Sequence, residues 1–105
     1  MVGKYKVITL CGSTKFKEDF IREQKRLTLE GNIVLSVGLF GHSGSSEAFV
    51  PETKAMLDDM HKRKIDMSDE IFVINKDGYV GTSTKSEIEY AIAHGKHVNY
   101  LEPIK

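Results

Sequence analysis

Four short runs rich in β-branched and apolar residues alternate with three longer segments of helical periodicity, and this alternation restricts the fold more than any other feature. The runs cover residues 4–10 (KYKVITL), 32–37 (NIVLSV), 70–75 (EIFVIN) and 96–101 (KHVNYL). A strand, helix, strand order points to right-handed parallel crossovers. We therefore predict an α/β three-layer sandwich, flavodoxin/Rossmann-like, with a parallel sheet of four to five strands in the order 2-1-3-4.

The helical segments have recognisable ends. Ser13 or Thr14 is a suitable N-cap for the first helix, and Gly31 is a suitable end for it. Pro51 fits the first turn of a second helix that reaches about residue 67. The third helix is expected inside residues 81–95, with Ile88, Ala91 and Ile92 on one face. Residues 38–50, with a GHSGSS centre, favour a loop.

The composition narrows the choice of ligand and compartment. Fifteen basic and fifteen acidic residues cancel, which argues against a nucleic-acid polymer as partner and favours a small molecule. The chain of 105 residues is expected to form a single domain over 1–105. Its single cysteine, Cys11, and the absence of an apolar N-terminal run favour a cytoplasmic protein that makes no membrane contact.

Two hydroxyl-rich turns should meet at one edge of the predicted sheet. Gly12-Ser13-Thr14 follows the first strand, and residues 81–87 (GTSTKSE) follow the third. In the order 2-1-3-4 the topological switch falls between these strands, and ligands bind there beyond the carboxyl ends. The glycine spacing is that of neither a Walker P-loop nor a dinucleotide fingerprint, and a plain N-cap explains the first turn equally well.

Glu87 has two interpretations from its neighbours. Thr84-Lys85-Ser86-Glu87 matches a capping box, in which the glutamate reaches back to a backbone N–H. Alternatively, a carboxylate beside a phosphate-binding helix start could attack a sugar carbon. Glu89 lies two residues on and should face away from Glu87, so the two do not form a catalytic pair.

The chain resembles a known enzyme superfamily in three segments: residues 8–13, residues 69–75, and the EIEYA motif at 87–91 followed by Gly95-Lys96. These segments look like the nucleoside 2-deoxyribosyltransferase-like superfamily, which includes the 2'-deoxynucleoside 5'-phosphate N-hydrolases. The resemblance implies that Glu87 is the nucleophile and that the protein is a homodimer or higher homo-oligomer. Gly81 stands where the transferases have an aspartate, and His61 falls near a second acidic position.

The predicted site has ten members and no cofactor or metal. The resemblance assigns catalysis to Glu87. His61 is a candidate general acid or a residue that orients the ligand, although a half-exposed helix histidine without a catalytic role is the more common case. The predicted substrate-binding residues are Gly12, Ser13, Thr14, Gly81, Thr82, Ser83, Thr84 and, in the loop, His42. His94 and His97 lack a third metal ligand, and Cys11 is interpreted as a small apolar packing residue.

Three functions follow. The first, implied by the resemblance, is hydrolysis of the N-glycosidic bond of a small nucleoside 5'-monophosphate, or deoxyribosyl transfer from it. The second is a binding module for a nucleotide or an ADP-ribose-type ligand without turnover. The third is NAD cleavage, because TIR-type domains share a similar strand order and a helix glutamate.

Overall fold

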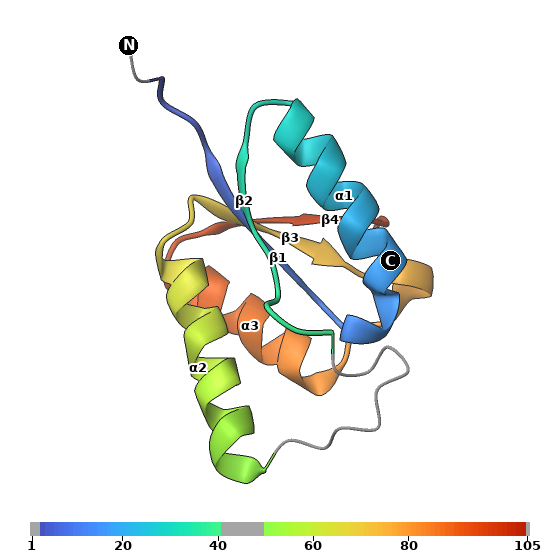
Figure 1. The fold of residues 1–105 in the computed structure, drawn as a ribbon, viewed down its shortest axis with the longest axis vertical. Helices are drawn as coiled ribbons and strands as arrows, with labels where there is room; N and C mark the ends of the chain where they lie inside the picture. Colours follow the sequence, from blue (N-terminus) through green and yellow to red (C-terminus); the bar gives the residue numbers. More distant parts are fainter. Residues whose placement is uncertain (1–2, 41–49, 105) are drawn as a thin grey trace.

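A four-stranded parallel sheet forms the centre of the protein (Figure 1). The structure is a computed structural model, and it describes residues 3–40 and 50–104. The sheet order is β2-β1-β3-β4, as predicted, and every pairing is parallel. The strands are β1 (Val7–Gly12), β2 (Ile33–Leu35), β3 (Glu70–Ile74) and β4 (His97–Tyr100), and the helices are α1 (Lys17–Leu29), α2 (Pro51–Asp66) and α3 (Thr82–Ala93).

Helices cover both faces of the sheet, which makes the fold a three-layer α/β sandwich (Figure 1). Successive side chains along a strand point to opposite faces, so β1 and β3 each supply two cores. One core lies against α1 and contains Ile8, Leu10, Phe20, Leu27, Phe72 and Ile74. The other lies on the face covered by α2 and α3 and contains Cys11, Ile65, Ile71, Val73 and Ala91.

Strand β1 lies between β2 and β3 and carries the site at its carboxyl end. It begins three residues later than predicted and continues to Gly12, which pairs with Ile74 of β3. A Cβ built on Gly12 would lie 2.9 Å from the Ile74 carbonyl oxygen, and Gly12 has a φ of +154°. Glycine therefore allows β1 and β3 to remain paired up to the point where the chain turns into the site.

The predicted ends of the first two helices are largely confirmed. The Ser13 hydroxyl accepts a hydrogen bond from the Lys15 N–H, although it caps a short 3₁₀ turn, Thr14–Phe16, that precedes α1. Gly31, with a φ of +97°, follows α1, and Pro51 is the first residue of α2.

Of the two interpretations of Glu87, the capping box does not hold in the structure. Helix α3 begins at Thr82 with Gly81 as its N-cap residue, so Thr84 already lies inside the first turn. Glu87 is consequently in the second turn, where it cannot satisfy the first free N–H groups. Of Ile88, Ala91 and Ile92, predicted to share one helix face, Ile88 and Ala91 pack into the core, whereas Ile92 is exposed.

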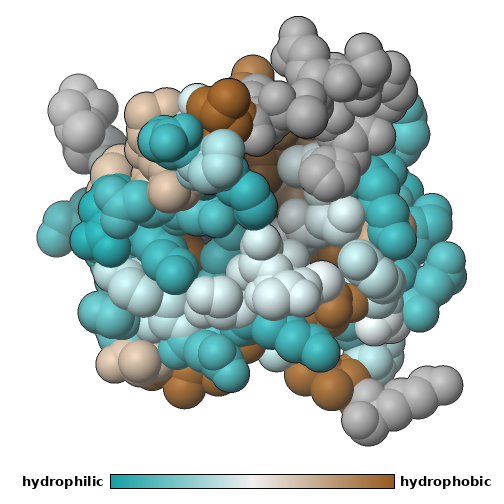
Figure 2. Space-filling view, turned by 90° about the horizontal axis from the view of Figure 1, so that it is seen from below, coloured by the Kyte–Doolittle hydropathy of each residue, from teal (hydrophilic) through white to brown (hydrophobic). Residues whose placement is uncertain are grey.

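No helix within residues 3–40 and 50–104 is both long and apolar enough to cross a bilayer. The face seen in Figure 2 is covered mainly by hydrophilic and neutral residues, and its hydrophobic residues form separate small patches.

Candidate active site

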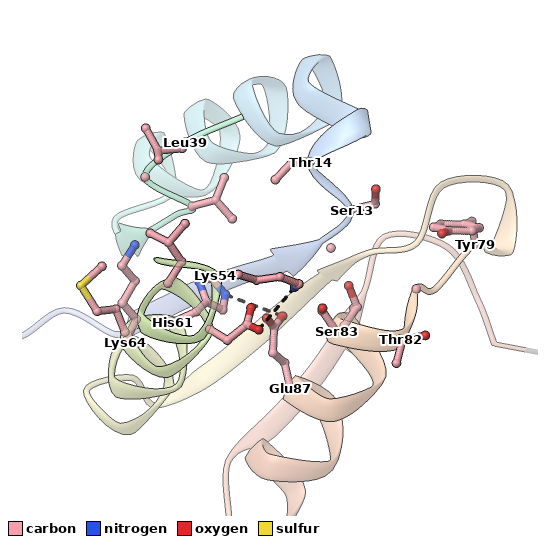
Figure 3. A pocket seen from close by; sticks show the side chains of 18 residues that line it. Ser13, Thr14, Leu39, Lys54, His61, Lys64, Tyr79, Thr82, Ser83 and Glu87 are labelled. Atoms are coloured by element: carbon pink, nitrogen blue, oxygen red, sulfur yellow. Dashed lines mark hydrogen bonds and ion pairs between the residues drawn. The ribbon is translucent and has the colours of Figure 1, made fainter. Parts of the chain in front are cut away.

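A pocket of about 520 Å³ opens where the carboxyl end of β1 meets the start of α3 and one face of α2 (Figure 3). The order of the strands explains its position, because β1 and β3 lead into connections that cross opposite faces of the sheet. The described residues that line it are Gly12, Ser13, Thr14, Val37, Gly38, Leu39, Lys54, Leu57, Asp58, Met60, His61, Lys64, Tyr79, Gly81, Thr82, Ser83, Thr84 and Glu87.

Nine of the ten predicted site residues lie around this one pocket. The tenth, His42, lies outside the described residues. Thr84 is almost fully buried, whereas Thr82 and Ser83 are exposed at the first turn of α3. Glu89 is exposed and does not line the pocket, in agreement with the prediction that it does not pair with Glu87. A role for these residues in ligand binding stays a prediction.

The Glu87 carboxylate is directed at α2 and β1. Its Oε1 lies 3.8 Å from Nε2 of His61, and Figure 3 shows the two side chains pointing toward each other. The same Nε2 lies 3.5 Å from Sγ of Cys11. The three ligand-type atoms of Cys11, His61 and Glu87 all lie within 4.8 Å of one another. Glu87 therefore contributes to the wall of the pocket and to a buried polar cluster at its base.

His61 is a neutral imidazole in this setting. Burial, and next the charge of Lys64, lower its pKa to about 4. The ring also makes a hydrogen bond with the Leu10 backbone. Since Nε2 faces Cys11 and Glu87, we assign this hydrogen bond to Nδ1–H, which leaves the Nε2 lone pair directed at the cluster. The half-exposed histidine considered from the sequence is thus a buried one, only 7% exposed.

Glu87 is held where its own charge is disfavoured. Burial raises its pKa to about 7, and the nearby charge of Asp58 acts in the same direction. A hydrogen bond from the Cys11 thiol opposes this shift, as do the charges of Lys62 and Lys54. Burial and the Glu87 carboxylate raise the pKa of Cys11 in turn, so the thiol keeps its proton and donates it. Near pH 7, Glu87 exists in both protonation states.

A second part of the pocket is lined by hydroxyl groups. Ser13 follows β1, while Thr82 and Ser83 occupy the first turn of α3, whose free backbone N–H groups create a partial positive charge. Ser83 lies four residues before Glu87 and therefore one turn away on the same side of the helix (Figure 3). This arrangement suits a ligand whose anionic group lies at the helix start and whose remaining atoms lie over Glu87.

Four polar residues that line the pocket were not predicted as site residues: Lys54, Asp58, Lys64 and Tyr79. Lys54, Asp58 and His61 lie on one face of α2, and Lys54 Nζ is 3.4 Å from an Asp58 carboxylate oxygen. Their spacing of four and then three residues is a helical signal that could have identified Lys54 and Asp58. Cys11 was interpreted as an apolar packing residue; its burial is confirmed, but its polar contacts come from other elements. Lys15 Nζ lies 3.6 Å from the centre of the Tyr79 ring, and no sequence pattern around Tyr79 indicated a place in the site.

Comparisons with protein-family models and with curated proteins gave no match to this chain.

Proposed function

We propose that the protein cleaves the N-glycosidic bond of a small nucleoside 5'-monophosphate, with Glu87 as the nucleophile. The carboxylate of Glu87 lies in the wall of an open pocket, opposite His61, instead of capping its own helix. This single observation carries the proposal, because a nucleophile has to reach the ligand, and a capping glutamate could not do so.

The hydroxyl part of the pocket favours a phosphorylated substrate. A 5'-phosphate at Ser13, Thr82 and Ser83 would receive hydrogen bonds from hydroxyl groups and from the N–H groups at the start of α3. The sugar would then extend along α3 toward Glu87. A pocket of about 520 Å³ has room for a molecule of nucleotide size.

The reaction consists of two displacements. The ionised carboxylate of Glu87 attacks the anomeric carbon, a C–O bond forms, and the C–N bond breaks with its electron pair passing to the base. The base nitrogen takes up a proton from water. A second water molecule then attacks the same carbon, the bond to Glu87 breaks, and the carboxylate is restored. Transfer to another base, in place of water, would follow the same first step.

His61 is better suited to positioning than to donating a proton. With a pKa of about 4, it is protonated in only about one molecule in a thousand at pH 7. The hydrogen bond to Leu10 fixes the ring, and Nε2 then limits where the Glu87 carboxylate can lie. The low pKa argues against the general acid role predicted from the sequence. The role that the contacts support, positioning of Glu87, differs from the predicted orientation of the ligand.

The test is release of free base from a panel of ribonucleoside and deoxyribonucleoside 5'-monophosphates, the corresponding nucleosides and NAD, followed by chromatography in the presence of a chelator. We expect release from at least one monophosphate. Glu87→Gln should lower the rate by about a thousandfold or more. Glu89→Gln is the matched control, since Glu89 is an exposed residue of the same helix, and it should retain the rate.

The other outcomes of the same panel separate the competing functions. Undiminished base release by Glu87→Gln would overturn the proposal. Nicotinamide release from NAD alone would favour the TIR-like activity. No base from any substrate, together with ligand-dependent thermal stabilisation, would favour a binding module.

A further inference from the structure

Three side chains with metal-binding atoms converge at the base of the pocket. We call Cys11, His61 and Glu87 the Cys–His–Glu cluster; they come from β1, α2 and α3, respectively. Cys11 is fully buried, and the side chains of His61 and Glu87 are 9% and 12% exposed. Three ligands carried by three regular elements are held more firmly than ligands carried by loops.

The distances in the cluster are close to those around a tetrahedral zinc ion. Zn–S bonds of about 2.3 Å and Zn–N or Zn–O bonds of about 2.0–2.1 Å place neighbouring ligand atoms roughly 3.3–3.6 Å apart. The Cys11 Sγ to His61 Nε2 distance is 3.5 Å, and the His61 Nε2 to Glu87 Oε1 distance is 3.8 Å. The third pair, Cys11 Sγ and the Glu87 carboxylate, lies within 4.8 Å, so Glu87 would have to move toward Cys11 for one ion to bind all three.

We propose that Cys11, His61 and Glu87 bind one zinc ion, with a fourth coordination position open to the pocket. Thiolate, imidazole and carboxylate are the three protein ligand types that zinc accepts, and three protein ligands with one open position are the usual pattern of a non-structural zinc site. Glu87 and His61 line the pocket, so the fourth coordination position would face it.

His61 presents Nε2 to both Cys11 and Glu87, as a shared ligand set requires. Zinc accepts ionised sulfur and carboxylate ligands, so the Cys11 thiol and any protonated Glu87 would release their protons to solvent when the ion binds. A thiolate from Cys11 and a carboxylate from Glu87 together carry two negative charges, which a divalent ion neutralises. The bound cluster is therefore uncharged overall, which suits a buried position better than a lone carboxylate does.

Zinc and substrate would compete for Glu87. Zinc withdraws electron density from a bound carboxylate and weakens it as a nucleophile, so the zinc-bound protein should be much slower in the reaction proposed above. Zinc uptake itself does not depend on that reaction, because it can be measured without substrate.

The experiment titrates the chelator-treated, dialysed protein with zinc against a chromophoric chelator. We expect about one equivalent to bind, and Cys11→Ser, His61→Asn and Glu87→Gln should each weaken the affinity by about tenfold or more. The matched control is the double variant His94→Ala and His97→Ala, which removes two exposed histidines and should bind as the wild type does. Cobalt gives a second readout: a sulfur-to-cobalt charge-transfer band that Cys11→Ser loses.

Two results would overturn the zinc site: no uptake by the wild type, or uptake unchanged in Cys11→Ser and Glu87→Gln. If circular dichroism shows that Cys11→Ser does not fold, zinc uptake by the near-isosteric Glu87→Gln variant decides whether the site exists. Zinc uptake without base release from any nucleotide would leave the metal site standing and reject the proposed activity. Base release without zinc uptake would support the proposed activity and reject the zinc site.

Discussion

At the level of single residues, the reaction proposed for the pocket depends on the charge of Glu87. Burial raises its pKa to about 7, and a nucleophile has to be ionised. In metal-free protein, kcat/KM should therefore rise with pH and level off above about 7. A rate that is constant from pH 5 to 8 would contradict this assignment of Glu87.

Two charge-neutralising variants should shift the pH at which kcat/KM rises, in opposite directions. Asp58 raises the pKa of Glu87, so Asp58→Asn should move the rise to lower pH. Lys62 lowers the pKa of Glu87, so Lys62→Gln should move the rise to higher pH. Each shift should amount to a few tenths of a pH unit, and the measurement is the pH dependence of kcat/KM for both variants beside the wild type. Shifts of the same sign would show that another group governs the profile.

Single residues also mark the limit of sequence reasoning. Glu87 and the hydroxyl residues were predicted because they lie within one short segment. Cys11, fifty residues from His61 along the chain, could not be placed beside it without knowing how β1 and α2 pack. The local pattern Thr84-x-x-Glu87 could not decide between a capping box and a free carboxylate, because it does not show that Gly81 takes the N-cap position.

At the level of elements, the start of α3 is the expected phosphate site. Ser83→Ala should raise KM for a 5'-monophosphate by about tenfold or more, because a hydrogen bond to a charged group is lost, and should change KM little for the nucleoside. Ser86→Ala is the matched control, since Ser86 belongs to the same helix but does not line the pocket. An equal effect of Ser83→Ala on nucleotide and nucleoside would place the phosphate elsewhere.

The close pairing of β1 with β3 makes Gly12 a sensitive position. Gly12→Ala would put a Cβ within 2.9 Å of the Ile74 carbonyl oxygen, whereas a Cβ at Gly31, also at positive φ, meets no atom within 4 Å. We expect Gly31→Ala to cost about 1 kcal/mol of unfolding free energy and Gly12→Ala to cost about 2 kcal/mol or more, measured by urea denaturation. Equal costs for the two variants would mean that the contact with β3 relaxes freely.

The elements themselves were predictable because each carries its own signal. Periodicity, Pro51 and Gly31 located the helices, and β-branched runs located the strands. The third helix was less well predicted: Ile92 has helical spacing from Ile88 but lies on the exposed side, since α3 packs through Ala91. Spacing defines a face, and packing against the sheet decides how wide the buried face is.

For the whole molecule, the Cys–His–Glu cluster links folding stability to pH. The pKa of Glu87 in the folded protein, about 7, exceeds its ordinary value of 4.5, so its contribution to stability is present below pH 4.5 and is lost as the pH rises through 7. The pKa of His61, about 4, lies below 6.5, so its contribution is present above pH 6.5 and is lost as the pH falls through 4. Between pH 4.5 and 6.5 the two contributions oppose each other.

Glu87→Gln removes one of these opposing contributions. We expect this variant to be more stable than the wild type by roughly 2–3 kcal/mol at pH 8, because a buried charge is gone, and to lose this advantage near pH 4.5. Urea unfolding at the two pH values, with a chelator present, measures the difference, and Glu89→Gln should match the wild type at both. A Glu87→Gln variant that is less stable than the wild type at pH 8 would contradict the burial of an ionised carboxylate.

The overall architecture was predicted because strand order and crossover handedness follow general rules that hold for parallel α/β sheets. Those rules also placed Ser13 and Ser83 at one pocket. They do not say which face α2 turns toward the pocket, so the helical spacing that groups Lys54 and Asp58 with His61 could place them at the site only if His61 itself was already placed there.

The most direct test of the account is a search for the covalent glycosyl-enzyme. The wild type, mixed with a nucleoside 5'-monophosphate that it cleaves and quenched with acid during turnover, should gain the mass of one sugar phosphate. Peptide mapping should locate that mass on Glu87, and Glu87→Gln should show no gain. Base release without any adduct on the chain, or an adduct on a residue other than Glu87, would contradict the account.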